Sequence, residues 1–421
     1  MSINPKLKDL KDSATLAINE LSNELIRERR KVYKLGLGQS PFPVPVPVVR
    51  ALRLHAGEKD YLPVSGLGAL QEAVCDFHRR KEGIVARSQD VLVGPGSKEL
   101  LFLLQLVYDS IVLLPTPCWV SYEPQAKIIG REIQVVQTSF ESQWKLTAKA
   151  LRESCEVLKN KKRPGLLILN YPNNPFGTSY SAQELQEIAQ IAREFGLIIL
   201  ADEIYGELQF DGAHVSMARY YPEGTIISSG LSKWAGAGGW RLGTFVFPES
   251  LQWIKKAMCA VASETYTSVC APVQYAAITA FRGGYEIDRY IFLSRKILKA
   301  LGYRCYEILK EGKVRLHPPT GAFYLFVDFS QTKKASSFSN SKELTSALLK
   351  ETGVAILPGT DFLRESHEMS ARIAYVDFDG SQALLAAGQL DSNTELGQDF
   401  LNENCSNVIE AMEVMTKWLN S

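Results

Sequence analysis

The sequence predicts an α/β fold in which helices flank a mostly parallel sheet, joined to a second, smaller α/β layer. Two observations carry this prediction. From residue 90 onward, short apolar runs alternate with stretches of helical periodicity, which is typical of a parallel sheet covered on both faces. The chain is also 421 residues long, which suits two domains better than one small domain. The runs expected to form strands are 91–93, 111–114, 166–169, 197–200, 225–227 and 244–247.

Helices are expected before and between these strands. Near the N-terminus, apolar residues recur every three or four positions with charged residues between them, which predicts an amphipathic helix. Its apolar positions are Leu10, Ala14, Ile18, Leu21 and Leu25. A second helix is expected from Ser181, a good N-cap, to Phe195. The apolar stretch from Leu100 to Leu114 is too short to cross a bilayer and is interpreted as a buried helix followed by a buried strand.

From about residue 285 the pattern changes to a long helix, a strand at 321–327 and a further helix. We expect residues 46–285 to form a large domain, and residues 1–45 together with 286–421 to form a small one. The stretch 377–406 is polar and rich in Gly, Ser and Asn, so it is expected to be a partly loop-like insertion before the last helix.

The composition excludes several classes of protein. The net charge of +1 provides no field that favours nucleic acid or an anionic membrane. The seven cysteines are scattered and form no CxxC pair, so we expect buried or half-buried free thiols in a reducing compartment. The five histidines form no HExxH motif, and no metal site is expected. Because the first residues lack the apolar core of a secretory signal, the protein is expected in the cytoplasm.

The residues after each apolar run carry the functional prediction, because parallel sheets bind ligands at the carboxyl ends of their strands. The turn Gly94-Pro95-Gly96-Ser97-Lys98 opens a helix and suits a phosphate, although many strand–turn–helix links use glycine. Trp119 follows the next run; a lone tryptophan is a core residue more often than a cofactor platform. Asn174 lies in a rigid turn between prolines that can present its amide.

Charged residues follow the later runs. Asp202 could bind a ribose, ligate a metal or pair with the nitrogen of a heterocycle. Lys233 lies in a Gly/Ser-rich loop ahead of Arg241, a combination that is unusual unless an anion or a carbonyl group lies there. Either residue alone would be interpreted as an exposed side chain. The combination favours a functional site.

These motifs, in this order, resemble the class I and II aminotransferases, enzymes that use pyridoxal 5′-phosphate (PLP). The stretch from Gly230-Leu231-Ser232-Lys233 to Arg241-Leu242-Gly243 is similar to the family's PLP-lysine signature, and Asp202-Glu203-Ile204-Tyr205 matches its DEIY strand end. Asn174-Pro175-Phe176-Gly177 resembles its NPTG turn, with Phe in place of Thr. The remaining matches, within about Gly36 to Arg372, are Tyr61 with Gly66 and Leu70, Trp119, Gly321-Ala322-Phe323-Tyr324 and Arg372-Ile373-Ala374.

The resemblance implies the PLP-dependent transferase fold, with the cofactor carried as a Schiff base on Lys233. Lys233, Asp202 and Tyr205 would be catalytic: the lysine moves a proton, the aspartate keeps the pyridine nitrogen protonated, and the tyrosine hydrogen-bonds the ring's 3-oxygen. The implied cofactor-binding residues are Gly96, Ser97, Lys98, Trp119, Asn174, Asp202, Tyr205, Lys233, Arg241 and Tyr61. The implied substrate-binding residues are Gly38, Trp119, Asn174 and Arg372.

The implied reaction moves an amino group between an L-amino acid and a 2-oxo acid, with Arg372 gripping the α-carboxylate. Two other PLP reactions, of the C–S β-lyase and α-oxoamine synthase types, stay open because they use the same residues. A non-catalytic ligand sensor with this fold also stays open. The identities of donor and acceptor stay open too. A homodimer is implied, in which Tyr61 reaches the neighbouring active site. Gly230 stands where many relatives have a phosphate-binding Ser, which shifts the expected phosphate contacts toward Arg241 and the turn from Gly96 to Lys98.

Overall fold

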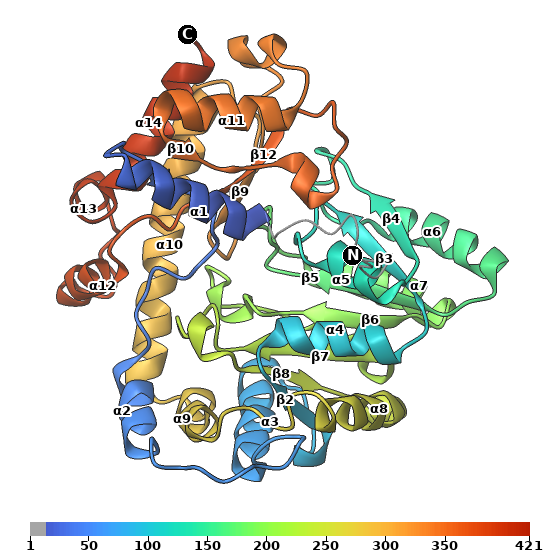
Figure 1. Cartoon of the computed structure of the whole chain (residues 1–421). Coiled ribbons are helices and arrows are strands. Elements are labelled where there is room, and N and C mark those ends of the chain that lie inside the picture. The colour runs from blue at the N-terminus through green and yellow to red at the C-terminus, as the bar shows by residue number, and fades with distance from the viewer. Residues whose placement is uncertain (1–13) are drawn as a thin grey trace, which may run out of the picture.

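The structure, a computed structural model, describes residues 14–421. The predicted N-terminal helix is present as α1 (Ala14–Arg27), and Leu10, which was assigned to it, lies outside the described residues. The next two helices, α2 (Val46–Leu54) and α3 (Gly68–Glu82), both pack against α9 (Ala271–Arg282). These three helices lie together at the lower end of the molecule in Figure 1.

Seven strands form one sheet in the order β2-β8-β7-β6-β5-β3-β4. The strands from β7 to β4 run parallel to one another, whereas β8 runs antiparallel to both of its neighbours. The predicted mostly parallel sheet is confirmed, and each of the six predicted runs overlaps a strand. The strands are β2 (Val91–Gly94), β3 (Ile111–Thr116), β4 (Ile133–Gln137), β5 (Gly165–Asn170), β6 (Ile198–Asp202), β7 (Thr225–Gly230) and β8 (Gly243–Val246).

Helices cover both faces of this sheet, as the side chains of β5 illustrate. Leu166 and Ile168 lie in one apolar cluster together with residues of α4 and α8, whereas Leu167 and Leu169 lie in the opposite cluster with residues of α6 and α7. Because both faces are buried, these strands are apolar throughout. α7 begins at the predicted N-cap, Ser181. The helices are α4 (Ser97–Val107), α5 (Tyr122–Ile129), α6 (Ala148–Lys161), α7 (Ala182–Glu194) and α8 (Gln252–Ser263).

A second layer of sheet is built by both ends of the described chain. β11, β12 and β9 form an antiparallel sheet, and β1 from the N-terminal segment pairs in parallel with β10. The predicted long helix is α10, which connects the lower and upper parts of the molecule in Figure 1. The elements are β1 (Tyr33–Lys34), α10 (Tyr285–Glu311), β9 (Tyr324–Asp328), α11 (Ser341–Thr352), β10 (Val354–Ala355), β11 (Leu357–Pro358), β12 (Ser370–Ala374) and α14 (Ser406–Leu419).

The stretch 377–406 agrees only in part with the prediction of a partly loop-like insertion. Residues 390–397 are loop, but the stretch also contains two helices that were not predicted, α12 (Gly380–Gln389) and α13 (Gln398–Asn404). Asp379 caps α12 by accepting hydrogen bonds from two backbone N–H groups, and the small residues of this helix pack into the core. The small and polar composition was interpreted as loop because short side chains carry little helical periodicity.

Among residues 14–421, no helix is both long enough and apolar enough to cross a bilayer. All seven cysteines are free thiols. Five of them are buried and Cys259 is half-buried, in agreement with the prediction, whereas Cys270 is exposed.

Candidate active site

The polar residues singled out in the sequence gather at one edge of the large sheet. Asn170, Asp202 and Ser228 are neighbours in register at the carboxyl ends of β5, β6 and β7. The turn from Gly96 follows β2, and Lys233 follows β7. Because β2 and β7 both run antiparallel to β8, these residues lie at the same edge. The fold thus brings together segments that are far apart in the sequence.

Asp202 is the last residue of β6 and is 4% exposed. Tyr122 donates a hydrogen bond from its hydroxyl to Oδ2 over 2.6 Å, and Ser228 Oγ donates to Oδ1 over 3.2 Å. Burial raises the pKa of Asp202, whereas the two hydroxyl donors lower it. The carboxylate is therefore fixed in direction and lies in a low-dielectric environment that favours pairing with a cation.

Lys233 lies in the loop after β7, and its Nζ donates a hydrogen bond to the backbone oxygen of Gly38 over 2.7 Å. The same nitrogen lies 5.5 Å from the ring centroid of Tyr205 and 5.8 Å from that of Phe323. Burial, and next the positive charge of Arg372, lower the pKa of Lys233 to about 8. An amine with such a pKa is partly uncharged near neutral pH and can act as a nucleophile or a base.

Two buried tyrosines lie beside this lysine. The hydroxyl oxygens of Tyr205 and Tyr324 are 2.8 Å apart and share a hydrogen bond. The Tyr324 hydroxyl also donates to the backbone oxygen of Gly38 over 3.5 Å. A Cβ atom added to Gly38 would lie 2.0 Å from the Tyr324 hydroxyl, so only glycine permits this close approach of the two segments.

Arg372 on β12 is 1% exposed, and its guanidinium points toward the same edge. Nη1 donates to Oδ1 of Asn174 over 2.9 Å, and Nη2 donates to the backbone oxygen of Gly36. Nε has no hydrogen-bond partner among the described residues. Burial lowers the pKa of Arg372, whereas Tyr324, Tyr205 and the carboxylate of Asp361 raise it. A buried guanidinium held by neutral oxygens retains its capacity to bind an anion.

The glycine-rich turn before α4 combines a helix N-terminus with a guanidinium. A Cβ atom on Gly96 would lie 2.3 Å from Nη2 of Arg241, and one on Gly243 would lie 2.2 Å from the backbone nitrogen of Ser97. Arg241 itself is held by the backbone oxygens of Gly238, over 2.8 Å, and Pro95, over 3.4 Å. The two glycines therefore let free backbone N–H groups and a cation lie side by side, which is an anion-binding arrangement.

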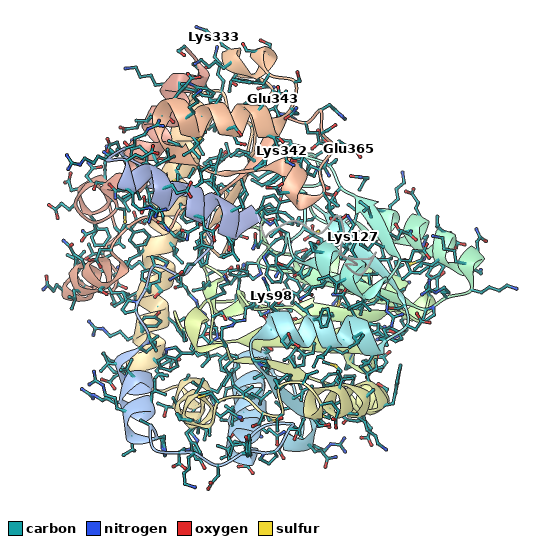
Figure 2. The ribbon with its side chains drawn as sticks, viewed as in Figure 1. Lys98, Lys127, Lys333, Lys342, Glu343 and Glu365 are labelled. Atoms are coloured by element: carbon teal, nitrogen blue, oxygen red, sulfur yellow. The ribbon has the colours of Figure 1, made fainter. Side chains whose placement is uncertain are left out.

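Lys98 adds a second cation at this turn and lies near the middle of the molecule in Figure 2. Burial, and then the charge of Arg241, lower the pKa of Lys98. Its Nζ lies 5.1 Å from the ring centroid of Trp119. Trp119 is half-buried and meets Tyr122 edge-on, with ring centroids 5.3 Å apart. The indole thus contacts Tyr122, which holds Asp202, and Lys98, which belongs to the turn.

Tyr61 lies apart from these residues. It is 90% exposed and occurs in the segment between α2 and α3. Within the described chain it forms no side-chain hydrogen bond or ring contact with the cluster around Lys233. The other residues assigned to the cofactor or the substrate each lie in one of the contacts described above.

The cluster also contains two buried tyrosines that were not predicted from the sequence to belong to a site. Tyr122 holds Asp202, and Tyr324 joins Tyr205 to Gly38. Tyr324 was recognised only as part of a motif. A tyrosine three residues after Trp119, at the start of a helix that follows a strand, could have been a signal for the first of them.

Comparisons with known proteins agree with this geometry. Residues 30–387 match the family described as aminotransferase class I and II. The aspartate aminotransferase of Geobacillus stearothermophilus is 32% identical over 380 residues, which cover 86% of this chain and 92% of that protein. The asparagine–oxo-acid transaminase of Streptococcus mutans is 31% identical over 369 residues, covering 85% of this chain and 91% of that protein.

A solved structure supports the same relationship. The aspartate aminotransferase from Thermus thermophilus with maleate superposes with a TM-score of 0.84 at 26% identity. The superposition covers 99% of this chain and 99% of that one. The similarity therefore extends over both sheets and the helices that connect them.

Proposed function

The chain belongs to the class I and II aminotransferase family, and from this premise we propose that it uses PLP to move an amino group between an L-amino acid and a 2-oxo acid. The observation that carries the proposal is the position of Lys233. Its amine has a pKa of about 8 and lies in a cluster that also contains Asp202 and Arg372. A reactive amine, a buried acid and a buried guanidinium are the groups that this chemistry needs.

The residues of the site fit PLP at each part of the molecule. The turn at Gly96 and Ser97, with Arg241 and Lys98, supplies N–H groups and positive charge for the phosphate. Asp202 supplies a buried carboxylate for the protonated pyridine nitrogen. A Cβ on either of the two glycines at the turn would close this cradle, which supports its role as a binding surface.

Three further residues complete the proposed cofactor site. We assign Tyr205 and Asn174 to the ring's 3-oxygen, because both are buried polar groups beside Lys233 or Arg372. Trp119 is assigned to the ring face, since its indole is held by contacts with Tyr122 and Lys98.

When bound, PLP supplies an electron-withdrawing ring that stabilises negative charge at the substrate Cα. Lys233 would hold the cofactor covalently through Nζ, release it to the incoming amine, and then accept the proton that leaves the Cα. A lysine that is partly uncharged near neutral pH suits both tasks. Asp202 would keep the ring nitrogen protonated, because a buried anion strongly favours a cationic partner.

The α-carboxylate of the substrate is assigned to Arg372. Its guanidinium is buried and already held in place by Asn174 and Gly36, so the fork can bind a carboxylate with two hydrogen bonds. The backbone at Gly38 would lie beside the bound substrate, since its oxygen contacts Lys233 in the structure described here. Orientation by this arginine would place the Cα hydrogen near the lysine amine.

The proposal is tested by half-reactions with single amino acids, followed through the absorbance of the cofactor. Aspartate is the first donor to test, because relatives named for aspartate aminotransferase activity are about a third identical to this chain. We expect the 2-oxo acid to appear in one equivalent without an acceptor, and turnover when 2-oxoglutarate is added. Pyruvate and ammonia released without any oxo-acid acceptor would instead identify a β-eliminating enzyme and overturn the proposal.

We also propose that the enzyme is a homodimer in which Tyr61 reaches the partner's cofactor phosphate. Its 90% exposure within one chain supports this role, because a phenol that serves only its own subunit would be expected to contact it. Mixing a Tyr61→Phe subunit with a Lys233→Ala subunit should restore one intact site per mixed dimer. A fully active monomer in light scattering would contradict the proposal.

The division into a large domain, 46–285, and a small domain, 1–45 with 286–421, is likewise proposed. The large sheet lies between residues 91 and 246, and the smaller sheets take their strands from residues 33–34 and 324–374. Limited proteolysis with cuts near residues 45 and 285 would support these boundaries. Cuts confined to other loops would contradict them.

A further inference from the structure

Three buried side chains outside the proposed active site meet close to the end of β6. Glu82 is the last residue of α3, Glu203 follows Asp202 directly, and His214 lies in the next loop. One ligand atom from each of the three lies within 4.8 Å of the other two. His214 Nε2 and Glu203 Oε2 are 3.1 Å apart. Side chains from three separate segments thus surround one point.

Each carboxylate in this cluster is held by further partners. Glu203 Oε1 accepts hydrogen bonds from the Tyr171 hydroxyl over 2.7 Å, Ser216 Oγ over 2.8 Å and the backbone nitrogen of Met217 over 3.1 Å. Glu82 Oε2 lies 2.8 Å from Nδ1 of His78. Carboxylates that ligate a metal are fixed in this way by hydrogen bonds to their outer side.

Two carboxylates are buried in this cluster. Glu203 is 4% exposed and Glu82 is 8% exposed, and two close carboxylates in a low-dielectric interior repel one another unless positive charge lies near them. Each carboxylate lies against an imidazole nitrogen, Glu82 against His78 over 2.8 Å and Glu203 against His214 over 3.1 Å. A divalent cation bound by both carboxylates would supply the positive charge that they need.

Each of the two histidine rings contacts a carboxylate through one nitrogen, His78 through Nδ1 and His214 through Nε2. The other nitrogen of each ring, Nε2 of His78 and Nδ1 of His214, is buried and has no hydrogen-bond partner among the described residues. Imidazole nitrogens and carboxylate oxygens together are a set of ligands for a divalent cation.

We propose that Glu82, Glu203 and His214 bind one zinc-class divalent cation, with His78 fixing the orientation of Glu82. Two carboxylates neutralise the double charge, and one imidazole favours zinc over magnesium or calcium. Zinc ligands lie about 2.0–2.2 Å from the ion and hence about 3.4 Å from one another, close to the 3.1 Å between His214 and Glu203. Three protein ligands leave the fourth position to a water molecule.

No compact motif signals this site, and no metal site was predicted from the sequence. The three ligands are separated by 121 and 11 positions, from residue 82 to 203 and from 203 to 214. Only the tertiary fold, in which α3 packs against β2 of the same sheet, brings them together. A bound ion would therefore tie α3 to the segment that follows Asp202.

Zinc binding to the purified full-length enzyme tests the proposal. After treatment with a chelator and its removal, we expect one equivalent of zinc to bind at pH 8, measured by calorimetry and elemental analysis, and no comparable binding of magnesium. Glu82→Gln should weaken zinc binding by more than about 100-fold, and His78→Gln by about 10- to 100-fold. Glu58→Gln is the matched control, because Glu58 also contacts a histidine, His55, but on the surface.

Cobalt distinguishes this site from the free thiols of the chain. Cobalt bound by oxygen and nitrogen shows no thiolate-to-metal charge-transfer band, and its visible bands should disappear in Glu82→Gln. Unchanged zinc affinity in Glu82→Gln, or a thiolate band in the wild-type cobalt protein, would overturn the proposal. Should Glu82→Gln fail to fold, as judged by circular dichroism, the wild-type cobalt spectrum alone decides between these outcomes.

Discussion

Tyr122 donates a hydrogen bond from its hydroxyl to Oδ2 of Asp202 over 2.6 Å. Both side chains are buried, and this contact is shorter than that from Ser228 to the same carboxylate. In a low-dielectric environment, a hydroxyl donor stabilises the ionised form of a carboxylic acid. Tyr122 thus helps to determine how strongly Asp202 can hold a cationic partner.

Replacing Tyr122 by Phe should therefore lower kcat. The lost hydrogen bond to a charged group corresponds to about 1.5–3 kcal/mol, which is about a 10- to 150-fold decrease. Because the donor lowers the pKa of Asp202, its removal should raise this pKa further, and the acidic limb of the kcat profile should move to higher pH. Steady-state kinetics between pH 5 and 9 measure both effects.

Tyr108→Phe is the control for this substitution. Tyr108 is buried in the same apolar cluster, and its ring meets Trp253 rather than a carboxylate. We expect its kcat and its pH profile to match those of the wild type. Equal losses in Tyr108→Phe and Tyr122→Phe would show that the effect comes from packing and not from Asp202.

The pKa of Lys233 predicts how the apoenzyme captures PLP. Capture needs the uncharged amine, so its rate should rise with pH around a midpoint of about 8 rather than 10.5. After burial, the charge of Arg372 is the largest cause of the lowered pKa, so Arg372→Met should move the midpoint to higher pH. Stopped-flow absorbance of PLP mixed with apoenzyme gives the rates.

A distant cation serves as the control for this midpoint. Lys333 is exposed at the top of the molecule in Figure 2, far from the large sheet, and Lys333→Met should leave the midpoint unchanged. A wild-type midpoint near 10.5 would contradict the predicted influence of burial on Lys233.

Much of the fold could be predicted from the sequence because buried parallel strands are marked by uninterrupted apolar runs. β4 was not predicted because it lacks such an uninterrupted run. It lies at the edge of the sheet, and its apolar residues are accompanied by Gln134 and Gln137. The helices within 377–406 were missed because the small residues of α12 and the polar residues of α13 resemble loop composition.

In the candidate site too, some residues could be predicted from local motifs, whereas others are brought together only by the tertiary fold. Lys233 and Asp202 could be recognised because each lies at or shortly after the carboxyl end of a strand, within a motif. The Tyr122–Asp202 contact joins residues 80 positions apart, and no local pattern encodes it. The same holds for the cluster of Glu82, Glu203 and His214, which exists only once α3 has packed against the sheet.

Arg372→Lys should weaken the use of amino acids without weakening the binding of PLP. Lysine keeps the positive charge but not the planar fork that bonds both Asn174 and Gly36. We expect kcat/KM for an amino acid to fall about 10- to 150-fold, which corresponds to about 1.5–3 kcal/mol. An amine without an α-carboxylate is the control substrate and should react as slowly with the variant as with the wild type. Equal losses for both substrates would show that Arg372 does not read the carboxylate.

Gly38→Ala should disturb the contact that joins the N-terminal segment to β9. The added Cβ would lie 2.0 Å from the Tyr324 hydroxyl and 2.7 Å from two ring carbons, and Tyr324 is buried and bonded to Tyr205. Overpacking of this kind lowers the free energy of unfolding by about 1–3 kcal/mol, and kcat/KM should fall because Lys233 contacts the same backbone. Gly57→Ala is the matched control, since no atom lies within 4 Å of its added Cβ. Denaturant unfolding and steady-state kinetics of the two variants should separate them, and equal behaviour would contradict the predicted role of this contact.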